Sequence, residues 1–181
     1  MKVENTHLKD VLIITPEIFG DDRGFFLENW NSKNFASAGL DVNFVQDNTS
    51  RSKKGILRGL HFQLNQPQGK LVKVARGEVF DVAVDLRKSS KTFGNWVGRF
   101  LSEENKEIFW VPPGFAHGFL VTSKSAELIY RCTNYYDPED EHTIVWNDPD
   151  LNIEWPIKFG HPLISKKDTQ GISFSEAPFF E

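Results

Sequence analysis

Several things are scarce or missing in this sequence, and each absence narrows what the protein can be. Cys132 is the only cysteine, so no internal disulfide forms and a reducing, cytoplasmic location is expected. No stretch approaches the roughly 18 consecutive apolar residues of a membrane helix. The first residues also lack the apolar core of a signal peptide. We therefore expect no membrane partner.

Positive charge is scarce as well. The 21 Lys and Arg residues are outnumbered by 25 Asp and Glu residues, which gives a net charge of −4. Without an overall basic field, we expect no nucleic-acid partner. A small phosphorylated ligand stays possible, because a few local Arg and Lys side chains suffice for two phosphates.

Short β-strands account for most of what is present. The segment 79–86 alternates, with Phe80, Val82 and Val84 on one face and Asp81 and Asp85 on the other. Similar short runs predict strands at 11–15, 25–30, 43–50, 70–75, 95–101, 107–111, 118–122 and 126–134. Gly, Pro, Asn and Ser clusters separate them, which is typical of an all-β sandwich or barrel.

The remaining segments suggest one short helix and a long irregular tail. Ser32 is the expected helix N-cap, and Gly39 lies just past the expected end. From residue 137 onwards, repeated X-Pro steps disfavour helix and predict loops. Nothing marks a linker or a repeat, so we expect one domain over residues 1–181.

The most informative stretch is 55–63, Gly-Ile-Leu-Arg-Gly-Leu-His-Phe-Gln. It places His61 in an apolar segment, three residues after Arg58, and Lys70 follows soon after. One histidine with an Arg and a Lys indicates proton chemistry on an anionic ligand rather than a metal site. The alternative is a structural histidine that bonds the backbone.

A second histidine ends the Pro-x-Gly-x-x-His element at 112–117, which resembles the second motif of the cupin superfamily. Metal-binding cupins add His-x-His and Glu from their first motif. Here Gln63 stands where the second His would be, and no Glu follows at the expected distance. We therefore expect neither a metal nor a cofactor, because a metal site normally needs three or more protein ligands. His117 is either a satisfied loop histidine or a donor to a ligand oxygen.

Over nearly its whole length the chain resembles the dTDP-4-dehydrorhamnose 3,5-epimerase family. The matching segments are 19–28, 44–52, 55–62, 68–72, 79–87, 110–119, 130–136 and 163–168. The resemblance implies an all-β, cupin-type double-stranded β-helix (jelly roll) with one or two short helices, usually a homodimer, without metal or cofactor. It implies inversion of C3 and C5 of dTDP-4-keto-6-deoxyglucose, which supplies dTDP-rhamnose for cell-surface polysaccharides.

That reaction needs a base, an acid on the opposite face and stabilisation of an enolate. His61 is the natural base, because imidazole titrates near neutrality. The resemblance points to Asp168 as its carboxylate partner, whereas the sequence alone leaves Asp81 and Asp85 equally open. Lys70 is the candidate for the enolate charge, with a snorkelling surface lysine as the alternative. Tyr130 is the candidate acid, with a buried, backbone-bonded tyrosine as the alternative.

Holding the nucleotide diphosphate is a separate task, for which arginines are favoured. Arg23 and Arg58 are the candidates, with Lys167 as a weaker one. On an ideal strand Arg58 and His61 would point to opposite faces, so either a bulge intervenes or Arg58 binds from the rim. Phe25 or Phe26 could stack on the thymine, but core packing is the default for phenylalanine.

The remaining candidates for substrate contact rest on the resemblance. They are Glu28, Gln46, Asp47, Asn48 and Glu141. The resemblance also implies that the region around Arg23 comes from the partner subunit, so that residues 1–50 pack on, or exchange with, the partner. His7, His142 and His161 are interpreted as surface residues.

Three rival functions stay open from the sequence. One is a mono-epimerase that acts only at C3 or only at C5. Another is a non-catalytic sugar-nucleotide-binding cupin, which would have lost His61, Lys70 or Tyr130. The third is a metal-dependent cupin oxygenase, against which the incomplete first motif argues.

Overall fold

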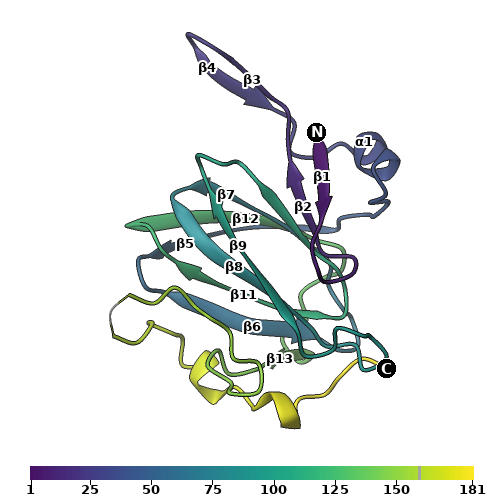
Figure 1. The fold of residues 1–181 in the computed structure, drawn as a ribbon, viewed down its shortest axis with the longest axis vertical. Coiled ribbons are helices and arrows are strands. Elements are labelled where there is room, and N and C mark those ends of the chain that lie inside the picture. Colours follow the sequence, from purple (N-terminus) through teal and green to yellow (C-terminus); the bar gives the residue numbers. More distant parts are fainter. Residues whose placement is uncertain (159) are drawn as a thin grey trace.

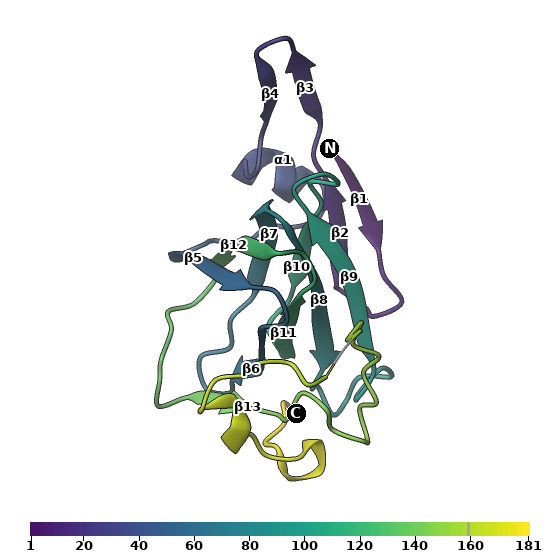
Figure 2. The ribbon, with the colours of Figure 1, turned by 90° about the vertical axis from the view of Figure 1, so that its left-hand side faces the viewer.

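A computed structural model describes residues 1–158 and 160–181 of the chain. Two antiparallel sheets face each other across a common core (Figures 1 and 2). The six-stranded sheet runs in the order β1 (Lys2–Asn5), β2 (Leu12–Thr15), β10 (Ile108–Val111), β7 (Lys70–Arg76), β12 (Ser125–Cys132) and β5 (Gln46–Lys53). The five-stranded sheet runs in the order β13 (Glu141–Thr143), β6 (Leu57–Gln63), β11 (Phe115–Val121), β8 (Glu78–Asp85) and β9 (Trp96–Ser102).

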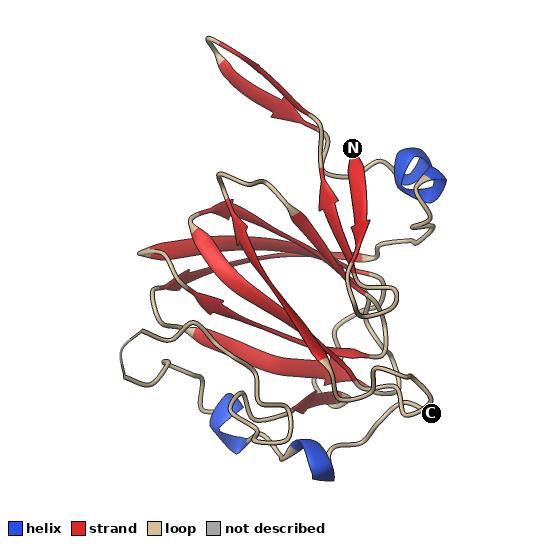
Figure 3. Cartoon of the chain, viewed as in Figure 1, coloured by secondary structure: helices blue, strands red, loops and turns tan. Residues whose placement is uncertain are grey.

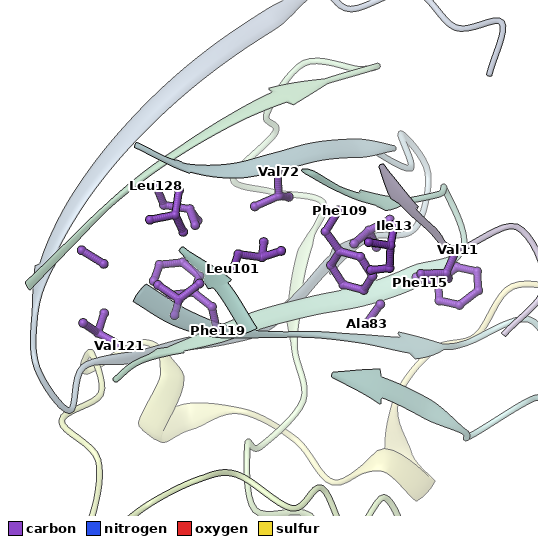
Figure 4. Close-up of a cluster of buried hydrophobic side chains, with 14 of the residues drawn as sticks. Val11, Ile13, Val72, Ala83, Leu101, Phe109, Phe115, Phe119, Val121 and Leu128 are labelled. Carbon is purple, nitrogen blue, oxygen red and sulfur yellow. The ribbon is translucent and has the colours of Figure 1, made fainter. Parts of the chain in front are cut away.

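Apolar side chains from both sheets form the core between them (Figure 4). Val72 and Phe109 come from the six-stranded sheet, and Leu101 and Phe119 come from the five-stranded sheet; each is 5% exposed or less. The facing sheets remove these side chains from water, which stabilises the barrel.

Further segments cover the outer faces of the two sheets. Helix α1 (Ser32–Ser37) packs Phe35 against the six-stranded sheet beside Trp110. The C-terminal segment packs Trp155 and Phe180 against the five-stranded sheet beside Phe80, Val82 and Val84. This explains why β8 is buried on both faces, with Asp81 and Ala83 turned to the inside.

A two-stranded hairpin stands apart from both sheets. Its strands β3 (Ile18–Asp21) and β4 (Gly24–Leu27) pair only with each other and project from the body of the protein (Figures 1 and 2). Their residues are mostly exposed, including large apolar side chains.

The predicted all-β jelly roll is confirmed (Figure 3). A strand overlaps every predicted segment, although β5 and β11 each extend three residues beyond theirs. The sequence did not predict β1, β3, β6 or β13 as strands. The N-cap of α1 is Asn31 rather than Ser32, because the Asn31 side chain accepts from the backbone N–H groups of Lys33 and Asn34. Gly39 does follow the helix, with a φ of 92°.

The C-terminal segment is irregular, as predicted. Its only helical turns in the described residues are two 3-10 helices, η1 (Asp168–Gln170) and η2 (Phe174–Glu176). None of the helices that the structure describes is long and apolar enough to span a membrane.

Candidate active site

A pocket of about 310 Å³ opens at one end of the barrel, between the two sheets. Strands β5, β7 and β12 supply one wall, and β6 and β11 supply the other. Its polar and charged lining residues are Gln46, Asn48, Ser50, Arg58, His61, Gln68, Lys70, His117, Tyr130, Tyr136, Glu141 and Lys167. Most of the predicted site residues therefore meet in one place.

A bulge in β6 brings Arg58 and His61 into this pocket together. In the pairing of β6 with β11, His61 lies opposite His117 and Arg58 lies opposite Phe119, so β6 carries one extra residue. Gly59, with a φ of 104°, makes the bulge possible. A Cβ at this position would lie 2.5 Å from the carbonyl oxygen of His117. The bulge alternative is thus confirmed, and the alternative that Arg58 and His61 point to opposite faces is wrong.

His61 is paired with Asp168. Its Nε2 lies 2.6 Å from Asp168 Oδ1. The segment that carries Asp168 is tied to the start of β6, since Leu163 exchanges backbone hydrogen bonds with Gly55 and Leu57. Burial by itself would raise the pKa of Asp168, but hydrogen bonds from His61, Ser165 and Gly59 and the charge of His61 hold it below its usual range. The carboxylate therefore stays charged and stabilises a protonated imidazole.

The other ring nitrogen of His61 faces the pocket. Glu141 Oε1 lies 3.8 Å from Nδ1, which is too long for a hydrogen bond. Glu141 is itself held by an ion pair with Lys167 and by the hydroxyl of Tyr136, which donates to Oε2 at 2.7 Å. Nδ1 is thus left free to accept a proton from a ligand.

The other two candidate carboxylates have different partners. Asp81 Oδ1 lies 2.7 Å from Nε2 of His117. Asp85 accepts hydrogen bonds from Arg87, Ser90 and Thr92 in a loop away from the pocket. Of the three candidate carboxylates, Asp168 is therefore the partner of His61, because the C-terminal segment folds back onto β6.

Burial shifts the pKa values of Lys70 and Tyr130 in opposite directions. It lowers the pKa of Lys70, although the charges of Cys132 and Asp81 oppose that shift. It raises the pKa of Tyr130, so this phenol keeps its proton at neutral pH. No ion pair of Lys70 within 4 Å is found among the described residues. The pocket thus holds an uncompensated cation and a protonated phenol.

Strand β5 presents a polar face to the pocket. Gln46, Asn48 and Ser50 alternate along it, and the amide of Gln46 donates to Asn48 Oδ1 at 3.0 Å. The Ser50 hydroxyl is buried and has no partner in the described part of the chain. Asp47 lies on the opposite face of β5, where Arg131 Nε is 3.3 Å away, so it does not line this pocket.

Comparisons with known proteins agree with this geometry. The family model for dTDP-4-dehydrorhamnose 3,5-epimerase matches residues 5–176. The chain belongs to this family. The enzymes of that name from Pseudomonas aeruginosa and Salmonella typhimurium are 55% and 56% identical to it, over at least 97% of every chain compared. The crystal structure of the 3,5-epimerase from Legionella pneumophila Philadelphia 1, in complex with dTDP-4-keto-L-rhamnose, has a TM-score of 0.95 at 50% identity. It covers 98% of this chain and 94% of the Legionella chain.

Three candidate residues of this epimerase lie outside the pocket, on or beside the projecting hairpin (Figure 1). Arg23 is 90% exposed and binds Asp21 at the hairpin tip. Phe26 is 69% exposed, and its neighbour Phe25 is 63% exposed. Glu28 accepts hydrogen bonds from Asn31 and Asn34. Core packing for the two phenylalanines, the default expectation, is wrong for this chain.

Five residues of the pocket were not predicted from the sequence. They are Ser50, Gln68, Gly118, Phe119 and Tyr136. The alternation of side chains along β5 would have identified Ser50, because Ser50 shares a strand face with Gln46 and Asn48. Tyr136 lies in a loop, and its position depends on Glu141 and Lys167, which no local pattern reveals.

The histidines of the two cupin-like motifs have carboxylate partners. In residues 1–158 and 160–181, no three His, Cys, Asp or Glu side chains gather as metal ligands would. Instead, His61 and His117 each bind a carboxylate. Of the other histidines, His7 and His161 are exposed as predicted, whereas His142 is half-buried and stacks on Phe62.

Proposed function

We propose that this epimerase inverts C3 and C5 of dTDP-4-dehydro-6-deoxy-D-glucose, giving dTDP-4-dehydro-L-rhamnose for dTDP-L-rhamnose synthesis. The observation that carries the proposal is the His61–Asp168 pair at 2.6 Å, in the same pocket as Lys70 and Tyr130. Membership of the family supports this substrate, because the crystal structure of the Legionella relative contains dTDP-4-keto-L-rhamnose, the product proposed here.

The His61 ring acts as the base. Both carbons flank the C4 ketone, so removal of either proton leaves its electron pair in an enolate. Asp168 occupies Nε2, and therefore Nδ1 is the atom that takes the proton. The charged Asp168 carboxylate then stabilises the imidazolium that forms.

Lys70 and Tyr130 complete the proton transfer. The ammonium of Lys70 stabilises the negative charge that builds up on the C4 oxygen, and its buried position strengthens that interaction. Tyr130 keeps its proton because burial raises its pKa, and it delivers that proton to the face opposite His61. Each inversion thus converts imidazole and phenol into imidazolium and phenolate, after which both groups exchange protons with the solvent.

The diphosphate binds to the positive rim of the pocket. Arg58 and Lys167 line that rim, and His117 provides a further donor. Gln46, Asn48 and Glu141 supply hydrogen-bonding groups for the sugar and the nucleotide. No metal or cofactor takes part in this scheme.

The functional unit is a homodimer, in which the hairpin of one subunit completes the pocket of the other. Arg23, Phe26 and Glu28 lie outside the pocket of their own chain, and the exposed apolar surface of the hairpin supports a protein partner. In this arrangement Arg23 binds phosphate, Phe26 stacks on the thymine and residues 1–50 pack on, or exchange with, the partner. A cytoplasmic location remains a prediction.

Proton NMR of the purified protein with dTDP-4-keto-6-deoxyglucose tests the proposed reaction. The coupling constants of the ring protons report the configuration at C3 and at C5. We expect both to invert. Inversion at one carbon only would identify a mono-epimerase, and binding without any inversion would identify a sugar-nucleotide-binding protein.

A further inference from the structure

Two carboxylate–imidazole pairs face the same pocket, and the reaction uses only one of them as a base. His61 on β6 and His117 on β11 lie directly opposite each other in the sheet. His61 binds Asp168, and His117 binds Asp81. We propose that Asp81 is a positioning residue that keeps His117 protonated, so that this ring donates a hydrogen bond to an anionic oxygen of the substrate. The inference rests on the proposed function and extends it.

The surroundings of Asp81 are unusual for a structural carboxylate. Asp81 is 0% exposed, and its Oδ2 has no hydrogen-bond partner in the described residues. Asp85, four residues further along the same strand and also 0% exposed, accepts hydrogen bonds at both oxygens. A buried carboxylate with a single partner destabilises the fold unless that partner carries a compensating charge. For Asp81 that partner is His117.

The ring of His117 can donate to a ligand from Nδ1 only. Its Nε2 is engaged by Asp81 at 2.7 Å, and no described residue hydrogen-bonds Nδ1. A neutral ring that donates from Nε2 has a bare lone pair at Nδ1, which repels an anionic oxygen. A protonated ring donates from both nitrogens. A negative charge on Asp81 stabilises the protonated, positively charged form of the His117 ring relative to the neutral form.

The other charges at the pocket make Asp81 necessary. Three cations share the pocket with His117: Arg58 on β6, Lys70 on β7 and Lys167 in the C-terminal segment. The remaining titratable groups there are His61, Tyr130, Tyr136 and Glu141, and Glu141 is already paired with Lys167. Asp81 is therefore the negative charge in direct contact with His117, opposite these three cations.

The burial of Asp81 points the same way. Burial raises the pKa of Asp81, while the charge and hydrogen bond of His117 and the charge of Lys70 oppose the rise. The pKa of Asp81 still lies above its usual value, so its negative charge depends on the positive charges of His117 and Lys70, and the two members of the pair gain or lose charge together. Asp168 differs, because its pKa is held low and His61 remains free to accept a proton.

The anionic oxygen that His117 contacts has two possible sources, a phosphate or the enolate. A phosphate contact exists in the ground state and affects the Kd of dTDP, which has no sugar. An enolate contact exists only during reaction and affects kcat with the Kd of dTDP unchanged.

Asp81→Asn tests the inference in the full-length protein, with Asp85→Asn as the matched control on the same strand. At pH 7.5 we expect Asp81→Asn to weaken either dTDP binding or kcat by about 10- to 100-fold, the usual worth of a hydrogen bond to a charged group. Asp85→Asn lowers the Tm but leaves the Kd of dTDP and kcat as in the parent protein.

Nitrogen-15 NMR of labelled histidine gives a readout that does not depend on turnover. With dTDP bound at pH 7.5, we expect His117 to carry protons on both nitrogens in the parent protein and on one in Asp81→Asn. The same ring state in both proteins would overturn the inference. If the parent protein binds dTDP but turns over no substrate, the proposed reaction fails, while this spectrum still decides the role of Asp81.

A double-mutant cycle separates a positioning role from a structural one. In a His117→Gln background, Asp81→Asn should cost less than about twofold further, because its target is gone. Equal losses in both backgrounds would mean that Asp81 supports the fold only, and would overturn the inference.

Discussion

At the residue scale, burial sets the charge state of the groups that face the ligand. Lys70 and Tyr130 line the same pocket, where both are partly buried, and burial disfavours the charged form of each. For Tyr130 this is useful, because a proton donor has to arrive protonated. For Lys70 it is a cost to the fold, because the cation has no ion-pair partner within 4 Å in the described residues.

Tyr130→Phe is expected to separate proton removal from inversion. His61 still removes protons in this variant, so solvent deuterium continues to enter the substrate. Inversion falls by about 10²- to 10⁴-fold, because no acid remains on the opposite face. The measurement is NMR of the sugar in D2O, which follows exchange and configuration together. Equal losses of exchange and inversion would contradict this division between base and acid.

Lys70→Met is expected to stabilise the protein while it abolishes turnover. Replacing a partly buried cation that has no ion-pair partner within 4 Å in the described residues with an apolar side chain should raise the free energy of unfolding by about 1 kcal/mol. For a chain of this size each kcal/mol corresponds to about 2–4 °C in Tm. Loss of the charge at the enolate should lower kcat by about 10²- to 10³-fold.

The stability gain should also depend on pH. Burial lowers the pKa of Lys70 in the folded chain below its unfolded value. Above the folded pKa the unfolded chain binds more protons than the folded chain, so the parent protein becomes more stable as the pH rises. The difference in Tm between Lys70→Met and the parent is therefore largest near neutral pH and narrows at alkaline pH. A constant difference would show that the lysine is hydrated.

Residue types were easier to predict than residue pairs. A lone His with Arg and Lys nearby indicated acid–base chemistry on an anionic ligand, and all three residues line the pocket. The pairing of His61 with Asp168 spans 107 positions, so no local pattern could prefer Asp168 over Asp81 or Asp85. That choice depends on how the irregular C-terminal segment folds back onto β6.

At the scale of elements, the bulge in β6 is the feature that assembles the site. A regular strand would turn Arg58 and His61 to opposite faces, and the extra residue turns both to the pocket. Gly59 allows this because the backbone of β11 passes where a side chain would lie.

Gly59→Ala tests this feature, with Gly55→Ala as its control. Both glycines have a positive φ, 104° for Gly59 and 78° for Gly55, so alanine is strained at each. That strain costs about 1–2 kcal/mol. A Cβ at Gly59 would also lie 2.5 Å from the His117 carbonyl oxygen, whereas nothing lies within 4 Å at Gly55. We expect Gly59→Ala to lose at least about 1 kcal/mol more in chemical denaturation and most of its activity. Equal losses would show that the close approach is unimportant.

Strands with a clean period of two were predictable, whereas strands defined by their partners were not. The alternation of residues 79–86 matches β8, and both of its faces are covered. β6 was missed because Gly59 and the bulge break the period. β13 is three residues long and exists because it pairs with β6.

At the scale of the whole molecule, the hairpin β3–β4 exposes a large apolar surface. It carries exposed Ile18, Phe19, Phe25 and Phe26, and it projects away from the barrel of its own chain (Figures 1 and 2). Monomeric soluble proteins rarely expose a large contiguous apolar surface of this kind. The sequence predicted a strand at 25–30, but it could not show that Ile18–Asp21 pairs with this strand or which pocket the hairpin serves.

Mixing two inactive variants tests whether the hairpin acts in trans. Arg23→Ala and His61→Ala each remove one part of the proposed dimeric site. If subunits exchange at random, half of the dimers are mixed and each mixed dimer contains one intact site. Activity should then recover to about a quarter of the parent value. No recovery, with subunit exchange confirmed by mass spectrometry, would show that Arg23 and His61 act from the same chain.

The central claim is that His61, held by Asp168, removes protons from both C3 and C5 of the bound keto sugar. The most direct measurement is deuterium incorporation at each carbon in D2O, for the parent protein and His61→Ala side by side, with dTDP affinity as the control for folding. We predict deuterium at both carbons for the parent, and a rate below about one per cent of it for His61→Ala with dTDP still bound. Comparable incorporation by the two proteins would contradict the role of His61 as the base.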